Sequence, residues 1–253
     1  MVGDACIIRQ RTVHFLNQRW ILWLLAAALV AGFVSLGSWQ LRRADEKQRM
    51  LDGVAAALRQ QHAAPIAQAQ RGDSDGFSWV TATGEFLPSP ALLLDNQRSG
   101  DRVGVHVYGV FKPDAGSPLL VDLGWLPVPA NRVLPSVAIP RGRQELVGLL
   151  APPPAAGIAL GPAYVNEDAR GGLQRWLLTR VDLQALSLAL HLKLAPRVLR
   201  LDPALPLGYA RSLDVLPNTL PPERHRGYAL QWFGLALATV IAAIYLSFRR
   251  IPR

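Results

Sequence analysis

The residues best suited to chemistry lie near the C-terminal end of the chain, where His225 stands between Arg224 and Arg226 directly before a long apolar run. A neutral imidazole nitrogen is a common ligand of haem iron. The positive end of a helix that starts here, together with the two arginines, favours the neutral imidazole. The same arginines could bind haem propionates or lipid headgroups by charge-assisted hydrogen bonds. A lone histidine at a membrane surface can equally be without a function, so the spacing alone leaves both interpretations open.

Residues in the apolar run are predicted to lie on the same helix face as His225 and to extend this candidate site. Residues three and four apart share one face of a helix, so His225, Tyr228, Ala229 and Trp232 are predicted to form a stripe. An apolar porphyrin would lie along that stripe, against Trp232 and a facing helix. The Tyr228 hydroxyl could hydrogen-bond at its rim.

Two neighbour pairs of tryptophan and glutamine lie where the apolar runs end, Trp39–Gln40 and Gln231–Trp232. Tryptophan prefers the membrane interface, whereas a glutamine amide without a partner is costly in lipid. We therefore predict that the two helices pack together and form part of the wall of the site. The glycines that would permit close approach are Gly32, Gly37 and Gly234.

The elements that must position these residues are two uncharged runs, 20–41 and 227–248, each about the 20 residues needed to cross a bilayer. The first is longer than the apolar core of a signal peptide and is followed at once by Arg42 and Arg43, which favours an uncleaved anchor. We expect an α+β membrane protein in which two transmembrane helices flank an antiparallel β-rich extracytoplasmic domain with a short helix. The predicted parts are a cytoplasmic tail 1–19, helix 20–41, a periplasmic domain 42–223, helix 224–248 and a cytoplasmic tail 249–253.

The middle of the chain has the texture of short strands separated by Gly, Pro, Asn and Asp. Within "VGVHVYGVF", Val105 and Val107 are predicted to face one side of a strand and His106 and Tyr108 the other, so we interpret His106 as structural. Residues 182–192 are predicted to form a short helix with Asp182 as its N-cap.

The distribution of charged residues bears on the orientation in the membrane and on the class of binding partner. Arginines before the first run and after the second suggest cytoplasmic termini, but other cations flank the inner ends, so the count is not decisive. The six terminal arginines are Arg9, Arg11, Arg19, Arg249, Arg250 and Arg253. Although the net charge is +9, the arginines gather beside the apolar runs, where anionic lipid headgroups can accept them, and no nucleic-acid motif is present.

Recognised catalytic patterns are absent from the sequence. It contains no G-x-S-x-G, H-E-x-x-H, C-x-x-C, P-loop or dinucleotide fingerprint, and its one cysteine, Cys6, cannot form a disulfide within the chain. No two of the five histidines are spaced to share a metal on one helix. We therefore predict a protein that is not an enzyme.

Five segments of the chain resemble the surfeit locus proteins, which assist the assembly of haem–copper cytochrome c oxidase. The segments are "LGSWQLRRADEK", "GEF", "LLLDNQ" followed by "VGVHV", "LLVDLGWLP" and "RHRGYALQWFGLA", from residue 36 to about 236. The first of them contains Trp39, Gln40, Arg43 and Lys47 in the order expected for the family. The first and last are the more specific, because they coincide with the two predicted membrane boundaries.

This resemblance implies two membrane helices, a β-rich domain on the outer face of the bacterial cytoplasmic membrane, and the supply of haem a to oxidase subunit I. It also implies that a histidine at the mouth of the second helix, here His225, matters for haem. Two positions depart from the family pattern. Leu123 replaces an arginine before Gly124–Trp125, and Val105 stands where an aromatic residue is common.

Two principal hypotheses result. In the first, the protein holds haem a transiently and passes it to subunit I, working with other oxidase assembly factors in the cell inner membrane. In the second, it is a cofactor-free membrane scaffold that docks oxidase subunits through Trp125 and the "LLVDLGWLP" surface. A membrane-anchored enzyme is a third, less supported hypothesis. The residues assigned to haem are His225 as iron ligand, with Arg224, Arg226, Tyr228, Trp232, Trp39, Gln40 and Gln231 around it.

Overall fold

The computed structural model describes residues 3–60, 62–72, 76–156, 161–168, 174–215 and 219–248, and the side chains of 3–19, 167, 168 and 174 are not described. The chain divides into two compact units. One consists of Met1–Arg49 with Thr219–Arg253, and the other of Met50–Asn218; we call them the helical unit and the β unit. The predicted C-terminal tail 249–253 lies outside the described residues. Of the predicted tail 1–19, the structure describes the backbone from Gly3, which is helical.

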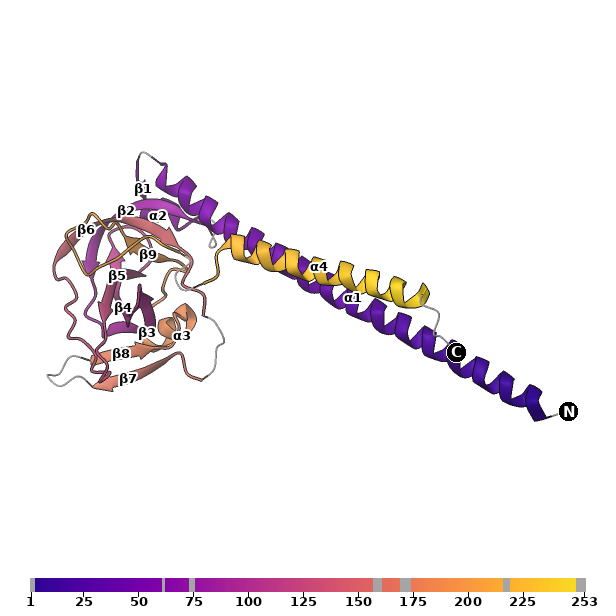
Figure 1. The fold of residues 1–253 in the computed structure, drawn as a ribbon. Coiled ribbons are helices and arrows are strands. Elements are labelled where there is room, and N and C mark those ends of the chain that lie inside the picture. Colours follow the sequence, from indigo (N-terminus) through magenta and orange to yellow (C-terminus); the bar gives the residue numbers. More distant parts are fainter. Residues whose placement is uncertain are drawn as a thin grey trace. The chain divides into compact units, whose positions relative to one another are not determined.

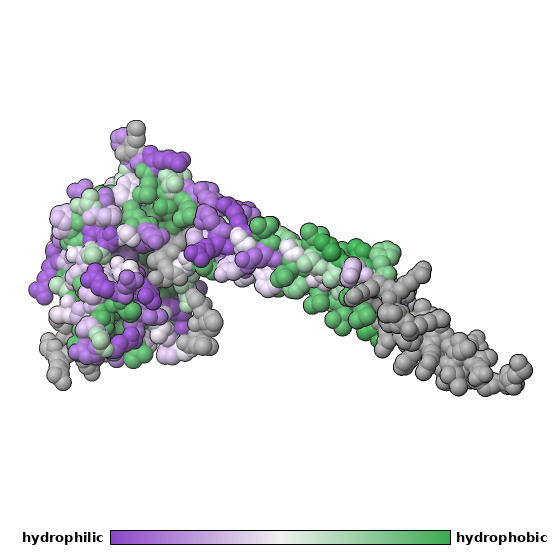
Figure 2. All heavy atoms as spheres, viewed as in Figure 1, coloured by the Kyte–Doolittle hydropathy of each residue, from purple (hydrophilic) through white to green (hydrophobic). Residues whose placement is uncertain are grey.

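Two long helices form the helical unit, α1 (Gly3–Leu58, which ends in the β unit) and α4 (Pro222–Phe248) (Figure 1). The segments Trp20–Leu58 and Pro222–Phe248 are long and apolar enough to cross a membrane. Large apolar side chains are exposed along both, and Figure 2 shows a continuous apolar stretch on the helix pair. Such a surface suits lipid, because apolar patches of this extent are rare on soluble monomers. This is the α+β membrane protein that the sequence predicts.

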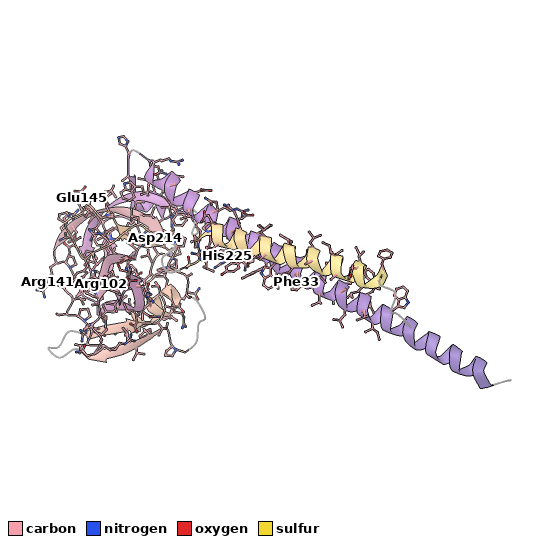
Figure 3. All side chains as sticks on the ribbon, viewed as in Figure 1. Phe33, Arg102, Arg141, Glu145, Asp214 and His225 are labelled. Atoms are coloured by element: carbon pink, nitrogen blue, oxygen red, sulfur yellow. The ribbon has the colours of Figure 1, made fainter. Side chains whose placement is uncertain are left out.

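Buried positions on the two helices recur every three or four residues, which is the spacing of a helix–helix seam. On α1 they are Gly37, Ala44 and Lys47, with Phe33 and Gln40 half-buried; on α4 they are Pro222, His225, Ala229 and Ala236. Figure 3 labels Phe33 and His225 along this helix pair. The helices run antiparallel, because Phe33 stacks on Trp232, with ring centroids 5.8 Å apart, while Lys47 reaches Leu220.

Close approach of the helices depends on one of the three predicted glycines. A Cβ atom on Gly37 would lie 2.8 Å from the ring of Phe233, which is closer than carbon atoms pack. The same atom on Gly32 or Gly234 would meet nothing within 4 Å. Gly37 therefore allows α1 to receive the Phe233 ring, whereas Gly32 and Gly234 lie away from the seam.

The β unit is a mixed sheet with two short helices. Its elements are β1 (Ala64–Pro65), α2 (Ile66–Ala69), β2 (Ser78–Phe86), β3 (Ala91–Ser99), β4 (Arg102–Pro113), β5 (Leu119–Pro127), β6 (Arg143–Ala151), β7 (Tyr164–Asp168), β8 (Gln174–Leu178), α3 (Leu183–Ala189) and β9 (Val198–Leu201). The Asp182 carboxylate accepts a hydrogen bond from the Ala185 amide at 3.0 Å. The predicted N-cap of α3 is therefore confirmed.

Strand pairing closes part of this sheet into a ring. Strands β2, β6, β9, β5 and β4 pair in that order, and β4 pairs back to β2, while β3, β8 and β7 extend from β4. The hairpins β3–β4, β4–β5 and β7–β8 pair antiparallel, as predicted. The pairs β1–β2, β3–β8 and β5–β9 are parallel, so the β-rich domain that the sequence predicts as antiparallel contains a mixed sheet.

Alternating side chains of the strands fill two separate cores. Val105 and Val107 of β4 lie in one core with Val121 and Leu123 of β5, and Tyr108 lies in a second core that includes Leu186 of α3. The predicted alternation along β4 is therefore correct. Leu123 sits in a bulge where Val107 pairs with Gly124 and Tyr108 with Asp122, and it is fully buried. At the position where the resemblance implies an arginine, this chain has a core leucine.

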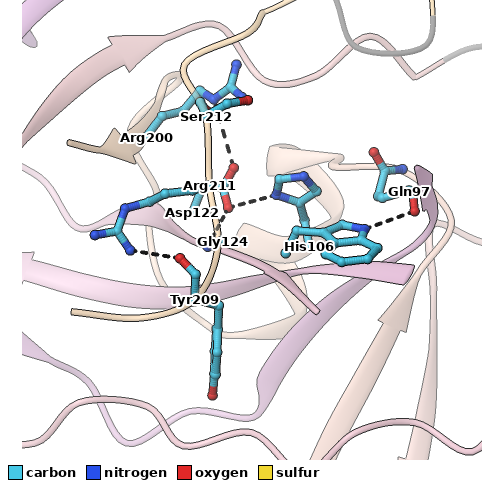
Figure 4. A network of polar contacts seen from close by, with 9 residues as sticks. Gln97, His106, Asp122, Gly124, Arg200, Tyr209, Arg211 and Ser212 are labelled. Carbon is cyan, nitrogen blue, oxygen red and sulfur yellow. Dashed lines mark hydrogen bonds and ion pairs between the residues drawn. The ribbon is translucent and has the colours of Figure 1, made fainter. Parts of the chain in front are cut away.

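A buried carboxylate joins three strands of the ring. Asp122 Oδ1 accepts hydrogen bonds from His106 Nδ1 and the Gly124 amide, both at 3.0 Å, and its Oδ2 lies 3.9 Å from Arg200 Nε (Figure 4). Gly124 has a φ of +114°, and a Cβ there would lie 2.7 Å from the Tyr209 carbonyl oxygen. His106, on β4, thus holds β5 in place, which agrees with its interpretation as structural.

The ionised form of Asp122 is favoured in the folded protein. Burial alone would raise its pKa, but the hydrogen bond and charge of His106, the charge of Arg200 and the Gly124 amide together lower the pKa below the usual value. Burial and the nearby Asp122 charge raise the pKa of the Tyr108 hydroxyl well above its usual value. The network therefore contains a carboxylate and a neutral phenol at neutral pH.

Replacement of Asp122 by Asn should destabilise the β unit. An aspartate with a lowered folded-state pKa stabilises the fold above about pH 4, and this contribution is lost as the pH falls through that lowered pKa. We expect Asp122→Asn to reduce the free energy of unfolding by about 1–3 kcal/mol at neutral pH, and the difference to shrink below about pH 4. Denaturant unfolding of the full chain in detergent, followed by near-UV circular dichroism, measures this.

The matched control is Asp114→Asn, because Asp114 forms an exposed ion pair with Arg143. Exposed pairs contribute less than about 1 kcal/mol. Equal losses in the two variants would contradict the role assigned to Asp122.

Replacement of Gly37 by Leu should separate the helices, because even a Cβ at this position meets the Phe233 ring. We expect a lower yield of cross-linking between cysteines introduced at Phe33 and Trp232 when a short bis-maleimide is added to a Cys6→Ser background. Gly32→Leu, at a position with open space around it, should leave the yield unchanged. A yield that Gly37→Leu does not lower would show that the seam does not depend on this glycine.

Candidate functional site

The start of α4 places His225 on the seam. Pro221 and Pro222 open the helix, and the Pro221 carbonyl accepts hydrogen bonds from the amides of Arg224 at 3.1 Å and His225 at 3.4 Å. Proline suits the first turn because its missing N–H would have no partner there. Glu223 in the same turn complements the positive end of the helix. The helix thus begins one turn before the histidine, whose side chain is only 6% exposed.

His225 makes one hydrogen bond, to a side chain of the other helix. Its Nδ1 lies 2.6 Å from Oε1 of Gln40, and an amide oxygen can only accept, so Nδ1 carries the proton. The lone pair of the neutral ring is then on Nε2. Nε2 is buried and has no hydrogen-bond partner among the described residues. A histidine held through one nitrogen by an acceptor, with the other nitrogen bare, is the arrangement of a metal-ligating imidazole.

Aromatic rings continue the seam beyond the imidazole. Phe33 and Trp232 stack at an interplanar angle of 26°, and the buried Ala229 lies between His225 and Trp232 on the same face of α4. Sequence reasoning missed Phe33. The signal was available, because Phe33 precedes Gln40 by seven residues and therefore lies on the same face of α1.

A buried cation lies on the other side of the histidine along the seam. The Lys47 side chain is only 5% exposed, and its Nζ donates to the carbonyl oxygen of Leu220, just before α4. Lys47 follows Gln40 by seven residues on α1, so both face α4. Lys47 belongs to the family segment "LGSWQLRRADEK", but the sequence alone assigns it no role.

The predicted site residues separate into two groups. The structure brings together His225, Gln40 and Trp232 on the seam. Trp39 is 50% exposed and Tyr228 is 40% exposed, and the remaining residues, Gln231, Arg224 and Arg226, are also on the exposed surface of the helices. The seam follows positions 225, 229 and 232, so Tyr228 lies to one side of it. Gln40 bonds to His225, and the exposed Gln231 has no place in the seam.

Other candidate sites in the described part of the chain are weaker. Within it, no group of three His, Cys, Asp or Glu side chains could hold a metal ion. His106 is engaged by Asp122 in the β unit. Trp125 is buried, its ring N–H donates to the Gln97 carbonyl at 3.0 Å, and the strand from Leu119 to Trp125 is buried with it. Residues 119–125 of the surface named for the scaffold hypothesis are therefore not available for docking, whereas Pro127 is exposed.

Comparison with known proteins agrees with the segments noted in the sequence. The family model described as "SURF1 family" matches residues 27–237. The chain is 31% identical over 227 residues to a SURF1-like protein of Rickettsia felis, covering 86% of this chain and 92% of that protein. It is 31% identical over 228 residues to a SURF1-like protein of Rickettsia bellii and 29% over 225 residues to one of Rickettsia conorii, with 86% of each chain covered in both cases.

The matched region contains the seam residues of both helices, the whole β unit and every predicted site residue. The chain therefore belongs to the SURF1 family, a family of assembly factors linked to cytochrome oxidase.

Proposed function

We propose that this protein is an assembly factor for haem–copper cytochrome c oxidase that holds haem a at the outer surface of the cell inner membrane and delivers it to oxidase subunit I. The observation that carries the proposal is His225 Nε2, a buried nitrogen without a described partner on a ring whose Nδ1 is fixed by Gln40. A buried polar atom without a partner costs free energy, so a ligand that it can bind would offset that cost.

The chain offers one nitrogen ligand and an apolar surface, which suits haem. Haem, as the cargo, would supply an iron that accepts an imidazole nitrogen and a large apolar macrocycle that carries carboxylates. His225 would bind the iron, Gln40 would keep its ring in the correct tautomer, and Trp232 would provide an apolar contact. Trp39 and Tyr228, exposed beside the seam, could cover the edge of the macrocycle. Because only one side of the iron would be bound, the cargo could be passed on.

Admission of the cargo requires movement within the helical unit. His225 Nε2 has almost no exposed surface while α1 and α4 are packed at this level. We therefore propose that the seam opens locally around His225 when haem binds, and that it closes again after transfer. The exposed Arg224 and Arg226 would hold this end of α4 at the anionic headgroups.

The proposed location and topology follow from the order of the elements. Gln40 comes just before the β unit in the sequence and His225 just after it, so both lie at the ends of the membrane segments that adjoin this unit. With cytoplasmic termini, the β unit is periplasmic and the site lies at the outer membrane surface. There the protein would meet subunit I and other oxidase assembly factors.

Loss of the His225 imidazole should abolish haem binding. We expect the chain purified from cells that make haem a to show a Soret band, and His225→Ala to lack it while retaining its membrane helices. The matched control is His62→Ala, because His62 is an exposed histidine of the β unit. Co-purification with oxidase subunits without any Soret band in the unchanged chain would instead favour the cofactor-free scaffold.

The amide of Gln40 should act as a positioning group for the imidazole. Partners of a metal-bound histidine contribute about 10–100-fold to metal affinity, so we expect Gln40→Leu to weaken haem binding by about that factor. Gln40→Glu keeps an acceptor oxygen at the same place and should restore most of the affinity. A haem titration followed by visible absorption measures both. Equal affinities for the Leu and Glu variants would show that hydrogen bonding to Nδ1 is unimportant.

A further inference from the structure

Lys47 is a buried cation without a described counter-ion. No carboxylate of the described residues lies within ion-pair distance of it, whereas Arg43, one turn earlier on α1, pairs with Glu46 at 2.8 Å. Lysine is almost never buried unless it is paired, because transfer of an ammonium out of water is costly. Among the described residues its hydrogen bond is to the Leu220 carbonyl, whereas an ammonium has three N–H donors.

The charged surroundings of Lys47 make its burial more unfavourable still. It lies beside the start of α4, which is the positive end of that helix dipole. Arg43 is a second cation close to Lys47, and Lys47 is also close enough to the His225 ring to act on it electrostatically. Glu46 pairs with Arg43, and Glu223 is exposed in the first turn of α4. Neither forms an ion pair with Lys47, so this cation lacks a counter-ion among the described residues.

The position of Lys47 indicates where that anion would come from. Lys47 faces α4 in the same row as Gln40, about 10 Å further along the helix axis. Arg224, Arg226, Arg42 and Arg49 are exposed on the outside of the helices, where lipid headgroups can reach them. An anion that meets Lys47 must enter the seam, as the cargo of His225 would do and as a lipid headgroup would not.

We infer that Lys47 binds a propionate carboxylate of the haem held by His225. The inference rests on the proposed function and refines it, because the sequence alone suggests Arg224 and Arg226 as partners of either the propionates or lipid headgroups. A carboxylate in this place would accept hydrogen bonds from Lys47 Nζ and offset the positive end of α4. Charge-assisted hydrogen bonds of this kind are stronger away from bulk water.

The test compares two porphyrins on the full chain in detergent. Ferric protoporphyrin IX carries free propionates, and its dimethyl ester carries none that are charged. We expect the unchanged chain to bind the free acid at least about tenfold more tightly, as one charge-assisted hydrogen bond would give. Lys47→Met should lose this preference, with weaker binding of the free acid and unchanged binding of the ester.

Two further variants complete the comparison. Lys47→Arg keeps a cation on the seam and should retain the preference for the free acid. Arg42→Met removes an exposed cation from the same part of α1 and should behave as the unchanged chain does. Binding of the ester provides an internal check that each variant is folded, since it depends on His225 and the apolar wall.

The outcomes separate this inference from the proposed function. If Lys47→Met keeps the full preference for the free acid and an imidazole-bound spectrum, Lys47 does not bind the propionate and the proposed function stands. If Lys47→Met weakens both porphyrins equally, the lysine supports the seam and the inference is again wrong. If the unchanged chain binds neither porphyrin, the proposed function fails together with the inference.

Discussion

The hydrogen bond between Gln40 and His225 is the contact on which the arrangement of the membrane segments depends. The two residues are 185 positions apart in the sequence, and their hydrogen bond joins α1 to α4. Water is scarce at this place, so a polar group without a partner would be costly. The contact explains why a glutamine ends the first apolar run. It also determines which nitrogen of the imidazole is bare, so one interaction links helix packing to the chemistry of the site.

A second polar centre performs a purely structural task in the β unit. Asp122 brings together side chains or amides from β4, β5 and β9, three strands that meet in the closed ring. Its carboxylate is stabilised by His106 and Arg200, so its burial does not leave a charge uncompensated. Lys47 is the opposite case in the helical unit, because it is buried and forms no ion pair with a described carboxylate. This difference is the reason why we assign a structural role to the first centre and propose a ligand for the second.

Much of the architecture could be predicted from the sequence, because membrane helices, strand alternation and an N-cap are local signals. The runs at each end, the alternation of Val105 and Val107 with Tyr108, and the cap at Asp182 are of this kind. The parallel pairs β3–β8 and β5–β9 could not be predicted, since pairing between distant strands leaves no local pattern. For the same reason the sequence placed both glutamines in the helix contact, whereas the exact angle of the seam selects Gln40 and excludes Gln231 and Tyr228.

Burial of the His225 Nε2 atom has a consequence for selectivity. A free copper or zinc ion is small, strongly hydrated and usually needs several ligands, and the described residues include no group of three His, Cys, Asp or Glu side chains that could hold it. While the helices are packed, such an ion cannot reach the nitrogen at all. A large apolar ligand gains free energy when it leaves water and contacts apolar side chains. This gain can offset the free energy needed to separate the two helices locally. Burial of this nitrogen therefore favours a large apolar ligand over a small hydrated metal ion.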